Sequence, residues 1–139
     1  MNIIAIILTA SMLIVSPTSN LSSLPFNNSA IVYGHNYLDG GKFYSLDIGD
    51  NVAVYFADGS AKVYTVTDVQ AYVAQSTELA NTGEDFPLRV GSEWRTVSQV
   101  IDSLSFDGSI VLITCYPAKG ITTGRLFVQL TEVRWQRRN

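Results

Sequence analysis

One pair of segments, residues 51–57 and 60–72, constrains the fold of this 139-residue chain more than any other feature. Apolar or β-branched side chains recur at every second position of both segments, namely Val52, Val54 and Phe56, then Val63, Thr65, Thr67 and Val69. This period is typical of β-strands. The dipeptide Asp58-Gly59 between the segments favours a type I′ turn. The sequence therefore predicts an antiparallel hairpin near the middle of the chain.

Further strands are expected at residues 30–34, 110–115 and 125–133, with turns at intervals of roughly ten residues. Residues 16–29 are rich in Ser, Asn and Pro and predict a loop. Together with the hairpin and the two strands that residues 3–15 can form, this pattern gives seven or eight strands. We expect a single mostly β domain over residues 1–139, folded as a largely antiparallel barrel or sandwich.

One short amphipathic helix is expected around residues 94–104. Its apolar side chains recur at helical spacing, at Trp94, Val97, Val100, Ile101 and Leu104. Ser92 and Thr96 are candidate caps. Shorter helical turns are expected near residues 43–46 and 76–79, and Phe106-Asp107-Gly108 predicts a turn into the next strand.

Residues 3–15 are strongly apolar and permit two interpretations. A signal peptide would need a basic residue before the apolar stretch, and none precedes it. The stretch is too short for a transmembrane helix. The second interpretation is a pair of strands broken near Thr9-Ala10-Ser11, which the many β-branched residues favour. In that case the chain is a domain without its natural membrane anchor.

Composition narrows the classes of function. Apolar residues make up 47% and charged residues 15% of the chain, as in a globular protein. The net charge of −3 gives no electrostatic case for nucleic-acid binding. The single Cys and single His exclude an internal disulfide and make a structural zinc site improbable.

The one cysteine, Cys115, ends an apolar strand, and Arg125 begins the next one. A thiolate is the reactive form of cysteine, and a neighbouring cation stabilises it. Arg125 is a permanent cation with a planar set of donors, which also suits a developing oxyanion. His35 is a candidate general acid and base, and the N–H of Tyr116 is a second candidate oxyanion donor. These residues predict a cysteine acyl-transfer enzyme.

The same residues resemble the signature of the bacterial sortases. Leu112-Ile113-Thr114-Cys115, the Arg ten residues later and the upstream Gly34-His35 match the family pattern Thr-Leu-x-Thr-Cys, with Val111 where Thr is common. Residues 3–11 resemble the family's first strand, with Ile4 and Ser11 in place of two prolines. The resemblance extends over nearly the whole chain.

This resemblance implies a closed eight-stranded β-barrel with one or two short helices. It implies a thiol protease-like transpeptidase on the extracellular face of the cytoplasmic membrane of a Gram-positive bacterium. Cys115 would cleave a Leu-Pro-x-Thr-Gly-like sorting signal of a surface protein or pilin and form a thioester. An amine, from a peptidoglycan precursor or a pilin lysine, would then resolve it. His35 and Arg125 would be the other catalytic residues.

The resemblance also implies substrate contacts on both sides of Cys115. Thr114 would line the pocket, residues 75–108 would border the substrate groove, and residues 116–124 would form a mobile loop. No cofactor is expected. Part of the family depends on calcium, and four acidic residues could be considered as ligands: Glu78, Glu84, Asp85 and Glu93. The preferred interpretation is that they belong to a solvated acidic loop. The sortase class stays open.

Two alternatives remain. Another cysteine acyltransferase would be an L,D-transpeptidase, but Ile113-Thr114-Cys115 lacks the glycine and the chain lacks the second His of that family. Papain-like peptidases place Cys before His, the reverse of the order seen here. The other alternative is a secreted, non-catalytic β-barrel binding module, such as a degenerate sortase that holds sorting signals without turnover.

Overall fold

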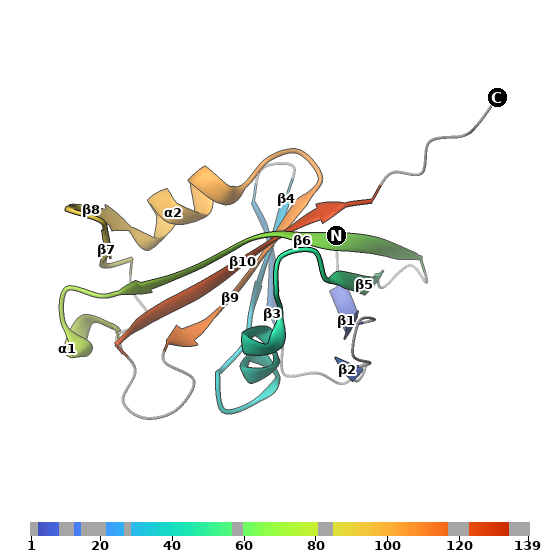
Figure 1. Ribbon diagram of the computed structural model, residues 1–139, viewed down its shortest axis with the longest axis horizontal. Helices are drawn as coiled ribbons and strands as arrows, with labels where there is room; N and C mark the ends of the chain where they lie inside the picture. Colours follow the sequence, from blue (N-terminus) through green and yellow to red (C-terminus); the bar gives the residue numbers. More distant parts are fainter. Residues whose placement is uncertain are drawn as a thin grey trace.

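The computed structural model describes residues 3–8, 13–14, 22–26, 29–56, 60–80, 85–116 and 123–133. One eight-stranded sheet runs through them in the order β2-β1-β5-β6-β10-β9-β4-β3 (Figure 1). Its strands are β1 (Ile3–Leu8), β2 (Leu13–Ile14), β3 (Ser22–Phe26), β4 (Ser29–Tyr33), β5 (Asn51–Phe56), β6 (Ala61–Val73), β9 (Ser109–Tyr116) and β10 (Gly124–Glu132). β4 and β9 pair in parallel, and the other neighbours are antiparallel.

The sheet has the eight strands of the expected barrel. Within the described ranges no ladder joins its edge strands β2 and β3, so the sheet is curled rather than closed. A separate two-stranded hairpin, β7 (Pro87–Val90) with β8 (Glu93–Thr96), lies outside this sheet. The helices are η1 (Asp39–Ser45), α1 (Thr77–Ala80) and α2 (Val97–Leu104). None of the helices in the described residues is long and apolar enough to cross a membrane.

The central hairpin is confirmed as β5 and β6, although its Asp58-Gly59 turn lies outside the described residues. Val52, Val54 and Phe56 are buried, as their alternation predicts. On β6 the buried residues are Tyr64 and Val66, and Tyr64 lies opposite the buried Val52. The register shifts beside Thr67, and beyond this shift the phase reverses, so that Val69 packs against the same apolar cluster.

The two strands that carry the cysteine and the arginine are buried on both faces. Alternate residues of β9 enter two apolar clusters: Ile110 and Leu112 in one, Val111 and Ile113 in the other. η1 packs into the first cluster through Phe43 and Leu46, and α2 covers the second. A sheet covered on both sides explains why residues 110–114 form one continuous apolar run.

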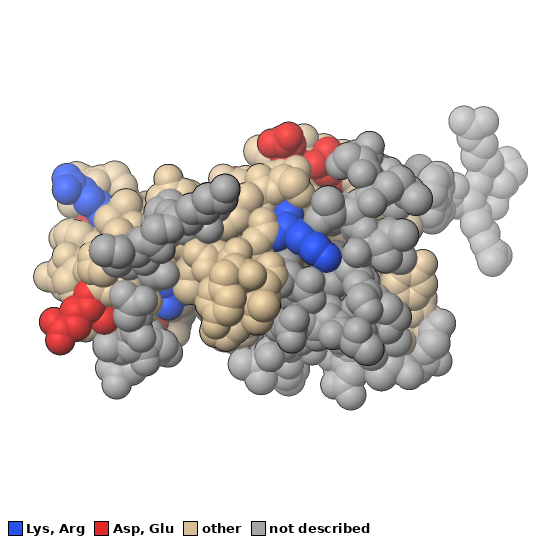
Figure 2. Space-filling model, turned by 90° about the horizontal axis from the view of Figure 1, so that it is seen from below, with Lys and Arg blue, Asp and Glu red and all other residues tan. Residues whose placement is uncertain are grey.

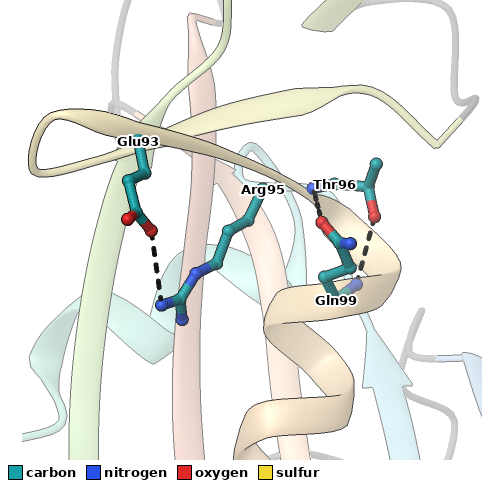
Figure 3. Close-up of polar contacts among 4 residues, drawn as sticks. All are labelled: Glu93, Arg95, Thr96 and Gln99. Carbon is teal, nitrogen blue, oxygen red and sulfur yellow. Dashed lines mark hydrogen bonds and ion pairs between the residues drawn. The ribbon is translucent and has the colours of Figure 1, made fainter.

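α2 is shorter than the sequence predicts. Thr96 caps it with a complete capping box, in which Thr96 Oγ1 accepts from the Gln99 N–H and Gln99 Oε1 accepts from the Thr96 N–H (Figure 3). Trp94 is not part of the helix: it lies on β8 and is 49% exposed. Ser92 is in the β7–β8 turn and does not cap α2. The sequence extends the helix too far because Trp94, on the short strand β8, lies at helical spacing from the apolar residues of α2.

The N-terminal apolar stretch forms strands. β1 pairs with β5 over much of its length and with β2, so the strand interpretation is confirmed for residues 3–8 and 13–14. The break expected near Thr9-Ala10-Ser11 lies outside the described residues. The loop expected at residues 16–29 is wrong in part, because β3 pairs with β4. β3 contains Pro25, which an edge strand tolerates because one side needs no donor.

Candidate active site

β9 and β10 bring the predicted nucleophile and the predicted arginine together. Arg125 lies directly opposite Cys115 in the antiparallel register. Directly opposed residues project from the same face of a sheet. This is the face of Ile113 and Phe127, which α2 covers farther along the strands. Cys115 is a free thiol of intermediate exposure, as a nucleophile needs to be.

β4 delivers His35 to the same end of the sheet. The Gly34 N–H donates to the Ile113 carbonyl oxygen at 3.1 Å, so the parallel pairing continues one residue past the end of β4. His35 therefore follows at the level of Cys115. Its imidazole is exposed and stacks on Tyr37, with ring centroids 5.1 Å apart. The three predicted catalytic residues thus come from neighbouring positions on three adjacent strands.

Arg125 is held in place by three contacts. Its Nη2 donates to the Ala80 carbonyl oxygen at the end of α1 at 2.8 Å, and its Nη1 donates to the Gly124 carbonyl oxygen at 2.9 Å. Its guanidinium carbon lies 4.8 Å from the centre of the buried Phe86 ring. These contacts orient the planar cation and leave it partly exposed beside Cys115.

η1 contacts the main chain of the nucleophile. The hydroxyl of Tyr44 donates to the carbonyl oxygen of Cys115, and the Tyr44 ring stacks on Tyr116 with centroids 6.5 Å apart. Burial, with smaller contributions from Cys115 and Tyr116, raises the pKa of Tyr44 to about 12. The hydroxyl therefore stays protonated, as a donor must, throughout the neutral range.

The two residues predicted to contact substrate have other partners in this structure. Thr114 is 2% exposed and donates its hydroxyl to the Gly34 carbonyl oxygen at 2.6 Å. It therefore ties the segment before His35 to β9. The carbonyl oxygen of Tyr116 accepts from the Thr123 N–H at 2.8 Å. Residues 117–122 lie outside the described residues, so the loop expected at 116–124 is described only at its ends.

Tyr33 lies on the same face of the sheet as Cys115, and the sequence did not identify it as a candidate site residue. It lies opposite Ile113 in the parallel register, two residues before the level of Cys115. Burial raises its pKa, the Arg125 guanidinium lowers it, and the Asp85 carboxylate raises it. A phenol that is influenced by the cation of the site and is 36% exposed is available to a ligand. The only sequence signal was its position two residues before the histidine.

The acidic residues considered for calcium form no metal-binding group within the part of the chain that the structure describes. Asp85 accepts from the Ser98 N–H at 2.8 Å, at the start of α2. Glu93 pairs with Arg95 at 3.9 Å, and both are solvent-exposed (Figure 3). Glu84 lies outside the described residues. Within the described ranges, no three His, Cys, Asp or Glu side chains are grouped as a metal site requires.

Charged side chains are scattered over the described part of one face of the molecule. On the face drawn in Figure 2, the Lys, Arg, Asp and Glu side chains of the described residues form no continuous patch.

Solved structures of sortases share this fold. Sortase A from Corynebacterium diphtheriae is 15% identical, with a TM-score of 0.59 over 100% of this chain and 64% of its own. Sortase C-1 from Actinomyces oris is 17% identical, with a TM-score of 0.58 over 94% of this chain and 73% of its own. A sortase C from Clostridium perfringens, at 17% identity and a TM-score of 0.48, is matched over 86% of this chain and 51% of its own. The chain thus spans about half to three quarters of the length of these relatives.

A comparison with family models agrees with the solved structures, although no curated protein sequence matches significantly. The family model described as "Sortase domain" matches residues 12–133, which is most of the chain. The matched range contains His35, Cys115 and Arg125. This chain belongs to the sortase family.

Proposed function

We propose that the protein is a cysteine transpeptidase that cleaves a sorting signal through a thioester on Cys115. The observation that carries the proposal is the direct opposition of Cys115 and Arg125 across two strands, with His35 leaving the third strand at the same level. A free, partly exposed thiol beside a fixed guanidinium is the arrangement that an acyl-transfer reaction requires.

The first half of the reaction forms the acyl-enzyme. The Cys115 thiolate attacks the carbonyl carbon of the substrate Thr. The Arg125 guanidinium stabilises the negative charge that develops on the carbonyl oxygen. The carbon–nitrogen bond to the following Gly then breaks. His35, as the imidazolium, donates the proton that the departing amine needs.

The second half transfers the acyl group. A primary amine attacks the thioester and loses a proton to His35. The carbon–sulfur bond breaks, and the Cys115 thiolate is regenerated with the His35 imidazolium restored. Water in place of the amine gives hydrolysis. We propose that the amine comes from a peptidoglycan precursor or a pilin lysine, and the acyl donor from a surface protein or pilin with a Leu-Pro-x-Thr-Gly-like signal.

The proposed reaction assigns the protein to the bacterial cell surface, on the extracellular side of the cytoplasmic membrane of a Gram-positive cell. Sorting signals and wall precursors are both present there. The alternatives have less support. L,D-transpeptidases belong to a different fold family. A module that only binds peptides would not require an oriented guanidinium opposite a free thiol.

A peptide-library cleavage screen with an added amine tests this function. Mass spectrometry would follow loss of the C-terminal fragment and formation of the amine adduct. We expect one group of Leu-Pro-x-Thr-Gly-like peptides to be cleaved at the Thr–Gly bond, with transfer in the presence of triglycine. A protein that binds these peptides but yields no cleavage product and no thioester would be the degenerate binding module instead.

Metal dependence is tested in the same screen. The acidic side chains of the described residues form no group of three that could hold a metal ion, and we propose that turnover needs no calcium. The expected result is that EDTA, and then excess CaCl₂, each change kcat/KM by less than about twofold. A clear loss with EDTA that CaCl₂ restores would show that a calcium site forms, and that it includes residues outside the described ranges.

Tyr33 is proposed as a substrate-contacting residue. In Tyr33→Phe we expect kcat/KM to fall about fivefold to tenfold, the effect of losing one hydrogen bond worth about 1 kcal/mol. The control is Tyr37→Phe, which removes the hydroxyl of a more exposed tyrosine that stacks on His35, and it should change kcat/KM by less than about twofold. Equal effects of the two changes would remove any special role for Tyr33.

A further inference from the structure

η1 makes contacts with both the nucleophile strand and the histidine segment. β4 ends at Tyr33, and the carbonyl oxygen of Ile113 accepts the last main-chain hydrogen bond from it, through the Gly34 N–H. In a strand, carbonyls two residues apart point to the same side. The carbonyl of Cys115 is therefore next in this row, beyond the end of β4. The hydroxyl of Tyr44 donates to this carbonyl oxygen, in the place where a main-chain N–H of a longer β4 would donate.

The same helix also lies against the segment that contains His35. A Cβ atom on Gly40 would overlap the carbonyl of Gly34, and one on Gly41 would overlap the carbonyl of Asn36. Neither glycine has a positive φ, so the requirement is for space and not for an unusual backbone conformation. The main chain of η1 is thus in close contact with the residues on both sides of His35.

η1 is itself anchored. Phe43 is 2% and Leu46 is 4% exposed, and both enter the first apolar cluster. The hydrogen bond from the Leu46 N–H to the Phe43 carbonyl oxygen closes the helix at its C-terminus. A helix that is anchored in this way can hold its two contacts at a constant separation.

We infer that η1 is the element that fixes the histidine segment relative to the nucleophile, with Tyr44 as a positioning residue that acts through the Cys115 carbonyl. The inference rests on the proposed function for its catalytic consequence. A displacement of reacting groups by about 1 Å can lower a rate by about 100-fold. The hydrogen bond from Tyr44 and the close contacts of Gly40 and Gly41 limit this displacement.

Tyr44→Phe is the decisive variant, because it keeps the ring stacked on Tyr116 and removes only the hydroxyl. We expect kcat to fall about tenfold with KM changed less than twofold, since the alignment of the reacting groups is lost and peptide binding is not. Hydrogen exchange should rise about tenfold in peptides covering residues 33–38 and 113–116, and stay unchanged in α2. The melting temperature should fall by only a few degrees.

Tyr64→Phe is the matched control. It removes a phenol hydroxyl from the same apolar cluster, but Tyr64 lies opposite Val52 and Glu132, on strands away from the site. It should leave kcat and the exchange of residues 33–38 unchanged. Gly40→Ala should show the same local exchange increase as Tyr44→Phe if it folds, and Tyr44→Phe alone suffices if it does not.

The two possible failures are distinguishable. If the wild-type protein cleaves no peptide, the proposed function fails, but hydrogen exchange still tests the role of η1. The inference is overturned if Tyr44→Phe raises exchange near His35 and Cys115 no more than Tyr64→Phe does. It is also overturned if exchange rises equally throughout the sheet, because Tyr44 would then contribute to stability alone.

Discussion

Cys115→Ala is expected to abolish turnover, with kcat/KM for the best sorting-signal peptide falling more than about 1,000-fold. The chain contains one cysteine, so no second thiol can replace it. Without the thiolate there is no thioester, and only the binding of the peptide remains. The measurement is cleavage of the peptide in the presence and absence of triglycine, with mass spectrometry of the protein to detect the acyl adduct.

Two controls separate loss of the nucleophile from loss of the fold. Cys115 is only partly buried, so the Cys115→Ala variant should keep its melting temperature within a few degrees of the wild type. It should also bind the peptide with an unchanged affinity. Iodoacetamide should label the wild-type protein once and stop its turnover. Residual cleavage by Cys115→Ala above the level of a heat-denatured sample would rule out the proposed mechanism.

The parts of the fold that were predictable are those in which local pattern and tertiary burial agree. The alternation of Val52, Val54 and Phe56 predicts β5, and Thr96, one of the two candidate caps, is the residue that caps α2. The catalytic candidates were found for a similar reason. They are rare residue types at the ends of apolar segments, and the sheet brings these ends together.

The missed features depend on partners that are distant in sequence. β3 looks like a loop because it contains Pro25, and only its position at the sheet edge makes a strand possible. The residues of β8 were predicted as part of the helix because Trp94 lies at helical spacing from the apolar residues of α2. The contact of Tyr44 with Cys115 joins residues 71 positions apart, and no local pattern reveals it.

The environment of Arg125 was equally hidden from the sequence. Its position opposite Cys115 follows from the two strands that flank a short loop. Its contacts with Ala80 and Phe86 do not, because these residues lie some 40 positions upstream and no local pattern connects them with Arg125. The position of the cation was therefore predictable from the sequence, but the means of holding its guanidinium plane was not.

These contacts make Arg125→Lys the second large effect. A lysine keeps the charge, but its ammonium is a single point donor. It cannot donate at once to the carbonyls of Ala80 and Gly124, lie over the Phe86 ring and face the oxyanion beside Cys115. We expect kcat/KM to fall about 100-fold to 1,000-fold, the usual cost of removing an oxyanion donor, although the net charge is unchanged.

Arg95→Lys is the matched control, because it makes the same change in a solvent-exposed pair with Glu93. It should change kcat/KM by less than about twofold. The melting temperatures of both variants and the alkylation rate of Cys115 complete the comparison. If Arg125→Lys keeps more than half of the activity, charge alone suffices and the oriented fork is not needed. A loss of activity that only parallels a large fall in melting temperature would mean that Arg125 joins α1 to the sheet for stability and has no direct role in transfer.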